Sequence, residues 1–368
     1  MNPSPWRIFL KATLLFVVFN LLLALFPSGQ GVRWSVYNHL VPGRERLPFG
    51  ENPSQAYNLS LFDVEAMFAS HVVSAQPSRP EYRVFIMGDS SVWGILLRPE
   101  ETLAGQLNAM HLMTADRRPV RFYNLGYPTI SLTKDLLLLA RARQEKPDLI
   151  LWLTTLEAFP PDKQHTPLVE HNRALLASLS APCLPPPPMP STDPLTALWQ
   201  RTLFGRRRAW ANWYRLQVYG VMWGITGIDQ FYPKTYTPAK IDLAADDTFH
   251  GLHQGSDLQT ALDWSLLDAG FCLAGETPII LVNEPILVSH GKNSDIRYNY
   301  FYPRWAYDQY RRILQDTAVK KQWYYLDLWH LVPATEFTNS AVHLTPHGEA
   351  LLAEQIRHAL QQNFLGTR

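Results

Sequence analysis

A serine and a histidine, far apart in the sequence, have the residue types needed for nucleophilic catalysis. Ser90 follows an apolar run that ends at Gly88, and a helical pattern begins shortly after it. A serine at such a turn lies near a helix N-terminus, where backbone N–H groups can stabilise an oxyanion. His343 precedes Thr345-Pro346, an N-cap followed by proline at the first helical position. The pair could act as nucleophile and base, although each residue alone is also typical of a structural turn or helix start.

Strands alternate with helices in the part of the chain that must position these two residues. Apolar runs that predict strands lie at Arg83–Gly88, Arg121–Leu125, Asp148–Leu153, Pro278–Val282 and Trp323–Leu328. Helical patterns separate them at Thr102–Leu112, Thr133–Gln144, Leu258–Leu273 and Pro303–Lys320. The alternation predicts βαβ units, and therefore an α/β fold with a doubly wound, mostly parallel sheet of five strands.

The residues that follow each expected strand predict the lining of a site, because ligands of open α/β sheets bind beyond the carboxyl ends of the strands. In strand order these residues are Asp89 and Ser90, Asn124 to Thr129, Thr154 to Glu157, Asn283 and Glu284, and Asn339 to His347. A serine, a histidine and loop N–H groups would thus meet at one edge of the sheet. Those are the groups that acyl transfer requires.

Three of these segments resemble the sequence blocks of the SGNH, or GDSL, hydrolase superfamily. They are Gly88-Asp89-Ser90, Asn124-Leu-Gly126 and Val342-His343-Leu-Thr, and the resemblance covers residues 81–368 apart from an insertion at 159–257. It implies a flavodoxin-like sheet, Ser90 as nucleophile and His343 as base. It also implies an oxyanion hole made by the Ser90 N–H, a glycine of the second block and an asparagine of the third.

The chain departs from the family pattern around the oxyanion hole. Gly126 is present, but the family's oxyanion glycine, five residues after Asn124, is replaced by Thr129, whose backbone N–H could still donate. The third block reads Thr154-Thr155-Leu156-Glu157 instead of Gly-x-Asn-Asp. A Glu157 carboxylate could donate to an oxyanion only if it were protonated, so this residue either has a raised pKa or another role.

A further departure concerns the residue that orients the histidine. Ser340 stands where the family has its acid, three residues before the histidine, and Asn339 is beside it. An asparagine can orient the imidazole but does not stabilise its charged form as a carboxylate does. Glu336 and Asp327 are alternative acids. These departures leave open a degenerate domain that binds glycan, or serves in envelope assembly, without catalysis.

The N-terminal 27 residues predict a membrane anchor. Between Ile8 and Phe26 only Lys11 and Asn20 interrupt an apolar run, which is long enough to cross a bilayer of ~30 Å. Basic residues at its start and the lack of a small-x-small cleavage site predict an uncleaved signal anchor with the rest of the chain exported. A buried helix of a soluble protein is the alternative. Residues 28–80 would then form a juxtamembrane stalk with a short helix near 61–73.

The insertion at 159–257 begins with a proline-rich loop and continues with an aromatic, basic helix. The loop holds Pro182, Pro185–Pro188 and Pro190, and the helical pattern runs over Arg201–Trp223. Aromatic residues recur in it at helical spacing beside a group of arginines. Such a helix could pack on its own domain, cap a cleft or lie on a membrane surface.

The bulk composition excludes some partners. With 33 Lys and Arg against 32 Asp and Glu, the chain lacks the basic field typical of nucleic-acid binding. The histidines form no metal-binding spacing and neither do Cys183 and Cys272, so we expect no metal and no cofactor. The two cysteines could pair in an oxidising compartment or remain free thiols.

The resemblance and the anchor together imply a function. We expect an extracytoplasmic ester hydrolase or O-acyltransferase that acts on acyl esters of an envelope glycan or lipid. A membrane-bound acyltransferase would be its partner if the reaction is transfer. The segment Asn293–Trp305, rich in tyrosine, arginine and asparagine, suits a polyhydroxylated or carboxylate ligand, or else is a polar loop held by its own side chains.

Overall fold

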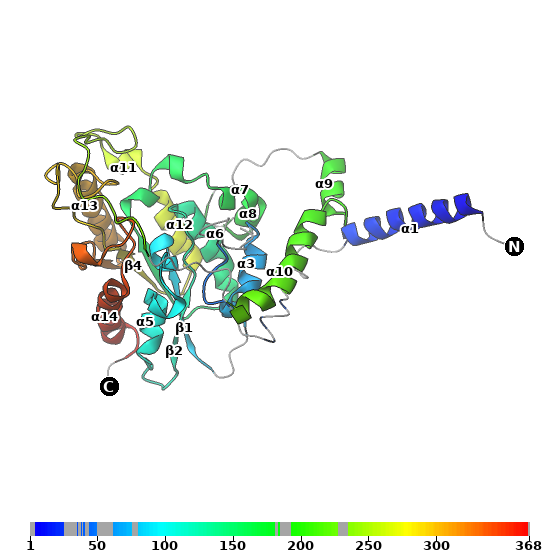
Figure 1. The fold of residues 1–368 in the computed structure, drawn as a ribbon, viewed down its shortest axis with the longest axis horizontal. Coiled ribbons are helices and arrows are strands. Elements are labelled where there is room, and N and C mark those ends of the chain that lie inside the picture. Colours follow the sequence, from blue (N-terminus) through cyan, green and yellow to red (C-terminus); the bar gives the residue numbers. More distant parts are fainter. Residues whose placement is uncertain are drawn as a thin grey trace.

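The fold is a five-stranded parallel sheet between two layers of helices (Figure 1). The computed structural model describes residues 4–25, 35, 38, 40, 44–49, 62–75, 80–180, 183–184, 193–226 and 235–366. The strands are β1 (Tyr82–Met87), β2 (Val120–Asn124), β3 (Leu149–Thr154), β4 (Ile279–Asn283) and β5 (Tyr324–Asp327). They pair in the order β2-β1-β3-β4-β5 with every neighbour parallel. The doubly wound sheet expected from the sequence is confirmed, and its order is the flavodoxin-like one.

Alternating side chains of the strands bury both faces of the sheet. In β1, Phe85 and Met87 join one buried cluster while Val84 and Ile86 join the other. Both sets are apolar because both faces are covered. The first face carries α6 (Leu132–Ala142), α12 (Ser265–Ala274) and α13 (Arg304–Lys321). The second face carries α5 (Leu103–Ala109) and α14 (Pro346–Asn363).

The strand order places the turn after β1 at the switch point of the sheet. The chain leaves β1 for β2 on one side and later crosses back to β3 on the other side. Because the connections diverge there, a crevice opens beyond the carboxyl ends of β1 and β3. Ser90 begins the short helix α4 (Ser90–Trp93) at this point.

One expected helix is divided in two. The pattern at Leu258–Leu273 forms α11 (Leu258–Ala261) and α12, with an extended residue, Leu262, after α11. A contact outside the expected helix accompanies the break: the Asp263 N–H donates to the carbonyl of Phe159 at 3.1 Å. The Trp264 indole reaches back to the carbonyl of Leu258 in α11 at 2.8 Å. The tertiary hydrogen bond to Phe159 therefore overrides a local helical pattern.

Parts of the segment expected to be a stalk pack into the domain. The helix α3 (Val64–Ser70) and Leu47 contribute side chains to the first buried cluster. Arg46 lies over the ring of Trp93 at 4.0 Å. Its guanidinium donates to the carbonyls of Trp93, Gly94 and Leu97 at 3.3, 2.8 and 3.0 Å. The residues before β1 thus cap the C-terminal end of α4.

The described residues of the insertion include four α-helices and, after them, an extended segment. The helices are α7 (Pro167–His171), α8 (Arg173–Ser180), α9 (Pro194–Arg201) and α10 (Arg207–Thr226). The proline-rich stretch at Pro182 and 185–190 lies outside the described residues. A disulfide joins Cys183 to Cys272 of α12, so the structure answers the question left open by the sequence in favour of pairing.

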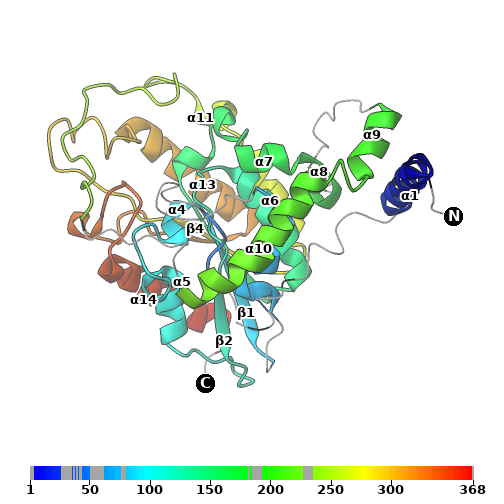
Figure 2. The same ribbon diagram turned by 45° about the vertical axis from the view of Figure 1, so that its right-hand side comes forward.

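The N-terminal helix α1 (Pro5–Leu25) extends away from the domain (Figures 1 and 2). It is strongly apolar, and within the described part of the chain it is the one helix long and apolar enough to cross a membrane. The helix α9 lies beside it in both views, next to its C-terminal half.

Candidate active site

Ser90 is held on a tight turn between β1 and α4. Asp89 caps the helix by accepting a hydrogen bond from the Ser91 N–H at 2.8 Å. The Gly88 carbonyl accepts from the Tyr127 N–H at 3.1 Å and from the Lys134 ammonium at 2.7 Å. Because the first N–H groups of a helix have no partner within it, the Ser90 N–H is placed to stabilise negative charge beside its own hydroxyl.

The structure brings Ser90, His343 and Asn339 into one chain of hydrogen bonds. His343 Nε2 lies 2.8 Å from Ser90 Oγ, and His343 Nδ1 lies 2.7 Å from Asn339 Oδ1. The amide oxygen can only accept, so Nδ1 carries the proton and Nε2 accepts from the serine hydroxyl. This is the order of nucleophile, base and orienting group that acyl transfer requires.

Burial keeps the base neutral. His343 is 8% exposed, and burial lowers its pKa to about 4. A neutral imidazole accepts the serine proton at any pH well above 4. No carboxylate contacts the ring in place of Asn339, among the partners that the structure describes.

Replacing Asn339 by aspartate is expected to raise the pKa of His343. A carboxylate beside Nδ1 stabilises the imidazolium, so the acid limb of kcat/KM should move up by about 1–3 pH units from a wild-type midpoint near 4. The rate of p-nitrophenyl acetate hydrolysis from pH 3.5 to 8 measures this shift. Asn363→Asp introduces the same charge at the exposed end of α14 and should leave the limb in place. An unmoved limb in Asn339→Asp would exclude Asn339 as the partner of the base.

The other acids proposed from the sequence lie elsewhere. Ser340 accepts a hydrogen bond from the Tyr300 hydroxyl at 3.2 Å. Asp327 pairs with Arg311 at 2.6 Å, and Glu336 accepts from the Thr345 hydroxyl. The orienting position is therefore four residues before the histidine and not three.

The N–H groups proposed for the oxyanion hole in the second block are already bonded. The Gly126 N–H donates to Asn124 Oδ1 at 3.0 Å, and the Thr129 N–H donates to the Tyr127 carbonyl at 2.6 Å. A Cβ on Gly126 would lie 2.5 Å from the Trp93 nitrogen, so this glycine permits close packing of the loop on α4. Its observed role is packing.

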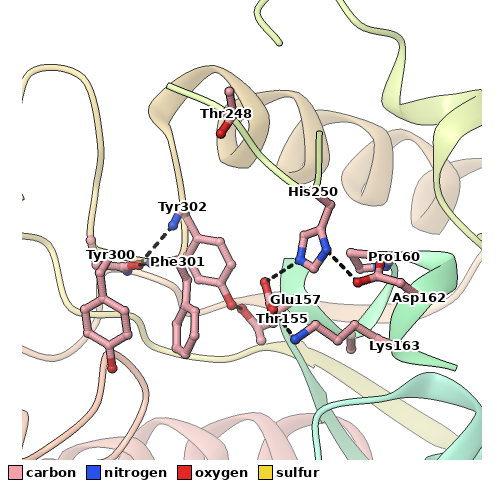
Figure 3. A network of polar contacts seen from close by, with 12 residues as sticks. Thr155, Glu157, Pro160, Asp162, Lys163, Thr248, His250, Tyr300, Phe301 and Tyr302 are labelled. Carbon is pink, nitrogen blue, oxygen red and sulfur yellow. Dashed lines mark hydrogen bonds and ion pairs between the residues drawn. The ribbon is translucent and has the colours of Figure 1, made fainter. Parts of the chain in front are cut away.

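Thr155 and Glu157 take part in a polar network beside the site (Figure 3). The Thr155 hydroxyl lies 3.0 Å from the Tyr302 hydroxyl. Glu157 pairs with Lys163 at 2.7 Å and with His250 Nε2 at 3.2 Å, and His250 Nδ1 lies 2.9 Å from Asp162. The hydrogen bond to Glu157 raises the pKa of His250. Through these ion pairs Glu157 links the insertion to the end of β3. This is a structural role, different from donation to an oxyanion.

Buried charged groups surround the turn that carries Ser90: the carboxyl groups of Asp89, Asp135, Glu284 and Glu349 and the ammonium of Lys134. Lys134 pairs with Asp135, and Ser91 donates to Glu284. Burial, then the negative charge of Asp89, raise the pKa of Glu284 well above its usual range. Burial raises the pKa of Glu349 to about 8. Glu284 therefore supports the turn by accepting a hydrogen bond from the Ser91 hydroxyl, and it is not in the hydrogen-bond chain of Ser90.

Glu349→Gln is expected to remove a pH dependence of stability. The folded protein holds the Glu349 proton up to about pH 8, whereas the unfolded chain releases it near 4.5, so wild-type stability falls as pH rises between these values. The amide of Glu349→Gln cannot ionise, so the variant does not lose this stability. The difference in free energy of unfolding between the variant and wild type should therefore grow by on the order of 3 kcal/mol across this pH window. Urea unfolding at pH 5 and pH 8 measures it. Glu354→Gln, exposed on the same helix, should retain the wild-type slope.

An open groove adjoins Asn339. Its volume is about 580 Å³, and it is lined by Tyr236, Thr237, Pro238, Ala239, Lys240, Tyr300 and Asn339. The insertion forms one wall, fixed where the Ala239 N–H donates to the Thr338 carbonyl at 2.8 Å. Most of the segment 293–305 is held by its own side chains, since Arg297 donates to the carbonyls of Asn299, Tyr300 and Phe301. Only Tyr300 of that segment lines the groove.

Sequence reasoning missed Lys134, Glu349 and His250. The sequence held a signal for Lys134. It forms a Lys-Asp pair inside the leucine-rich stretch 132–139, and a pair in such a stretch is buried when the helix packs its leucines into the core. Burial of the other two depends on tertiary contacts. Among the described residues no group of three or more His, Cys, Asp or Glu side chains could hold a metal ion.

Comparison with known proteins gives likeness in fold alone. No protein-family model and no curated protein sequence matches the chain. Among solved structures, a carbohydrate acetylesterase from Sinorhizobium meliloti has 12% identity and a TM-score of 0.35, covering 77% of this chain and 100% of that one. The aryl esterase of M. smegmatis has 13% identity and a TM-score of 0.32, covering 75% and 98%. A catalytic mutant of an acetylxylan esterase from Geobacillus stearothermophilus has 13% identity and a TM-score of 0.32, and the match covers 78% of this chain and 97% of that one.

Proposed function

We propose that this protein is a membrane-anchored, extracytoplasmic serine enzyme of the SGNH/GDSL type that acts on acyl esters of an envelope glycan or lipid. The observation that carries the proposal is the hydrogen-bond chain Ser90–His343–Asn339 at the carboxyl edge of the sheet. The reaction is hydrolysis of the ester or transfer of its acyl group to another hydroxyl.

Ser90 and His343 carry out both halves of the reaction. The Ser90 oxygen attacks the ester carbonyl while His343 Nε2 takes the hydroxyl proton, and the Ser90 N–H at the start of α4 stabilises the oxyanion. The C–O bond to the leaving group then breaks, and His343 returns the proton to the alkoxide. Water or an acceptor hydroxyl attacks the acyl-serine, with His343 again taking and returning one proton.

The groove beside Asn339 supports a glycan as one partner in the reaction. Tyr236 and Tyr300 offer ring faces and hydroxyls, and Lys240 offers a cation for an acidic substituent. Because one wall belongs to the insertion, a glycan bound against that wall would exclude water from the acyl-enzyme and favour transfer.

Two features support a location outside the cytoplasm. α1 has the length and hydropathy of a membrane span. The Cys183–Cys272 disulfide is of the kind that forms and persists in oxidising compartments. A membrane-embedded acyltransferase could then supply the acyl group across the membrane, which makes it the proposed partner of the transfer reaction.

The product formed from p-nitrophenyl acetate tests the reaction type. The purified full-length protein is expected to release p-nitrophenol and acetate in water, and to form acetylated sugar when an oligosaccharide acceptor is added, as detected by mass spectrometry. Release of p-nitrophenol without acetylated sugar would assign hydrolysis. A rate equal to that of buffer alone would overturn the enzyme assignment.

A second candidate is a glycan-binding protein without catalysis. The observation that favours it is the loss of free oxyanion donors in the second block, where the Gly126 and Thr129 N–H groups are bonded. Covalent labelling of Ser90 by a fluorophosphonate distinguishes the two candidates, because only an activated serine reacts.

A further inference from the structure

The helix α9 exposes apolar side chains toward α1 instead of toward the domain. Leu195 is 75% exposed and Trp199 is 52% exposed. Together with Leu198 and Phe204 they face Phe16, Val17 and Leu21 of α1 across an apolar cleft of about 370 Å³. We refer to these four side chains of α9 and the turn after it as the α9 face. Such a surface is costly in water, so it requires an apolar partner.

Asn20 connects the α9 face to α1. It is a polar residue within the apolar run of α1, and it is only 7% exposed on a helix whose other side chains are mostly exposed. Its amide nitrogen donates to the Phe16 carbonyl at 2.8 Å, and its amide oxygen accepts from the Phe204 N–H at 3.2 Å. Polar side chains within membrane helices typically face another segment of the protein with which they can form a hydrogen bond.

The depth of this contact matches the outer leaflet. Phe16 to Leu21 lie four to nine residues before Leu25, the last residue of α1. At 1.5 Å per residue this places α9 about 6–14 Å along the helix axis below its end. Interfacial helices bury their apolar face about 5–10 Å into the boundary of headgroups and acyl chains.

The residues that follow α9 suit a membrane surface. Arg201 and Arg207, which flank the turn, are both exposed and can meet lipid phosphates. α10 then leads from this turn to the domain, where it contacts α3 (Figure 1). It carries an exposed stripe of Tyr214, Val218 and Ile225 on one helix face.

We infer that the α9 face lies in the outer leaflet of the lipid bilayer, packed beside α1 and held there by Asn20. The inference rests on the proposed anchoring of α1. It gives the insertion a function: the domain has a second contact with lipid besides the transmembrane helix. The bilayer is the occupant that the observations favour, because α1 and α9 line the same apolar cleft.

Fluorescence quenching in lipid nanodiscs tests the inference on the full-length protein. Single cysteines at Leu195 in α9, Leu14 in α1 and Val319 in α13 would be labelled with an environment-sensitive dye. All three positions are well exposed, at 75%, 63% and 68%, so substitution there should not disturb folding. The native cysteines are joined to each other and should not react. Spin-labelled acyl chains are expected to quench the dyes at 195 and 14 several-fold and to leave the dye at 319 unchanged.

The outcomes separate this inference from the anchoring proposal. Quenching at 14 without quenching at 195 would overturn the inference and leave the anchor intact. Absence of quenching at both would overturn both. Asn20→Leu should reduce quenching at 195 while quenching at 14 persists, because it removes the acceptor for the Phe204 N–H. Unchanged quenching at 195 in that variant would overturn the role of Asn20.

Discussion

Ser90→Ala is expected to lower kcat/KM for p-nitrophenyl acetate by about four to six orders of magnitude. The Ser90 hydroxyl is the group at 2.8 Å from the base, and alanine leaves the base with nothing to activate. Covalent labelling by a fluorophosphonate should disappear with it. Steady-state rates and intact mass after labelling measure the two effects.

Ser178→Ala is the matched control, because this serine is exposed on α8 and lies outside the site. It should retain wild-type rates and labelling. Peptide mapping should place the adduct on Ser90 and not on Ser91, whose hydroxyl is bonded to Glu284. Equal rates for wild type and Ser90→Ala would favour the glycan-binding candidate.

His343→Ala is expected to lower kcat/KM by about four orders of magnitude or more, since the serine then loses the base that takes its proton. The loss should persist across pH 5–8, because burial keeps the wild-type imidazole neutral throughout that range. Reaction with the fluorophosphonate should slow in parallel.

His358→Ala provides the control for this second change. His358 is exposed on α14 and pairs with Glu354 at 3.2 Å, away from the site. It should show wild-type kinetics. Retention of activity in His343→Ala would mean that another group activates Ser90, and that the observed hydrogen bond is structural.

The parallel sheet and the proximity of Ser90 to His343 could both be predicted, because they follow from the pattern of apolar residues and from the topology of the sheet. Apolar runs covered on both faces predict buried parallel strands, and residues at their carboxyl ends share one edge. Asn339 could be assigned only as a neighbour of the expected acid position. Its place depends on how the loop closes: the Thr338 N–H donates to the His343 carbonyl at 2.8 Å, which brings residue 339 to the ring.

The buried charges could not be predicted, because their burial depends on contacts between distant segments. Glu349 lies in the first turn of an expected helix, where an acidic residue is ordinarily a surface feature. The bonding of the Gly126 and Thr129 N–H groups depends on loop conformation, which residue types do not determine. The role of Glu157 could not be predicted either, because both of its partners, Lys163 and His250, come from the insertion.

The packing of Arg46 on α4 affects how a fragment without the N-terminal helix should be designed. A fragment beginning at residue 81 would contain the five strands and both Ser90 and His343, yet it would lack the guanidinium that binds three carbonyls after the turn that carries Ser90. It would also lack α3 and expose the leucine-rich side of α6. A fragment for expression and crystallisation should therefore begin before Arg44, and the disulfide requires that it be produced by secretion.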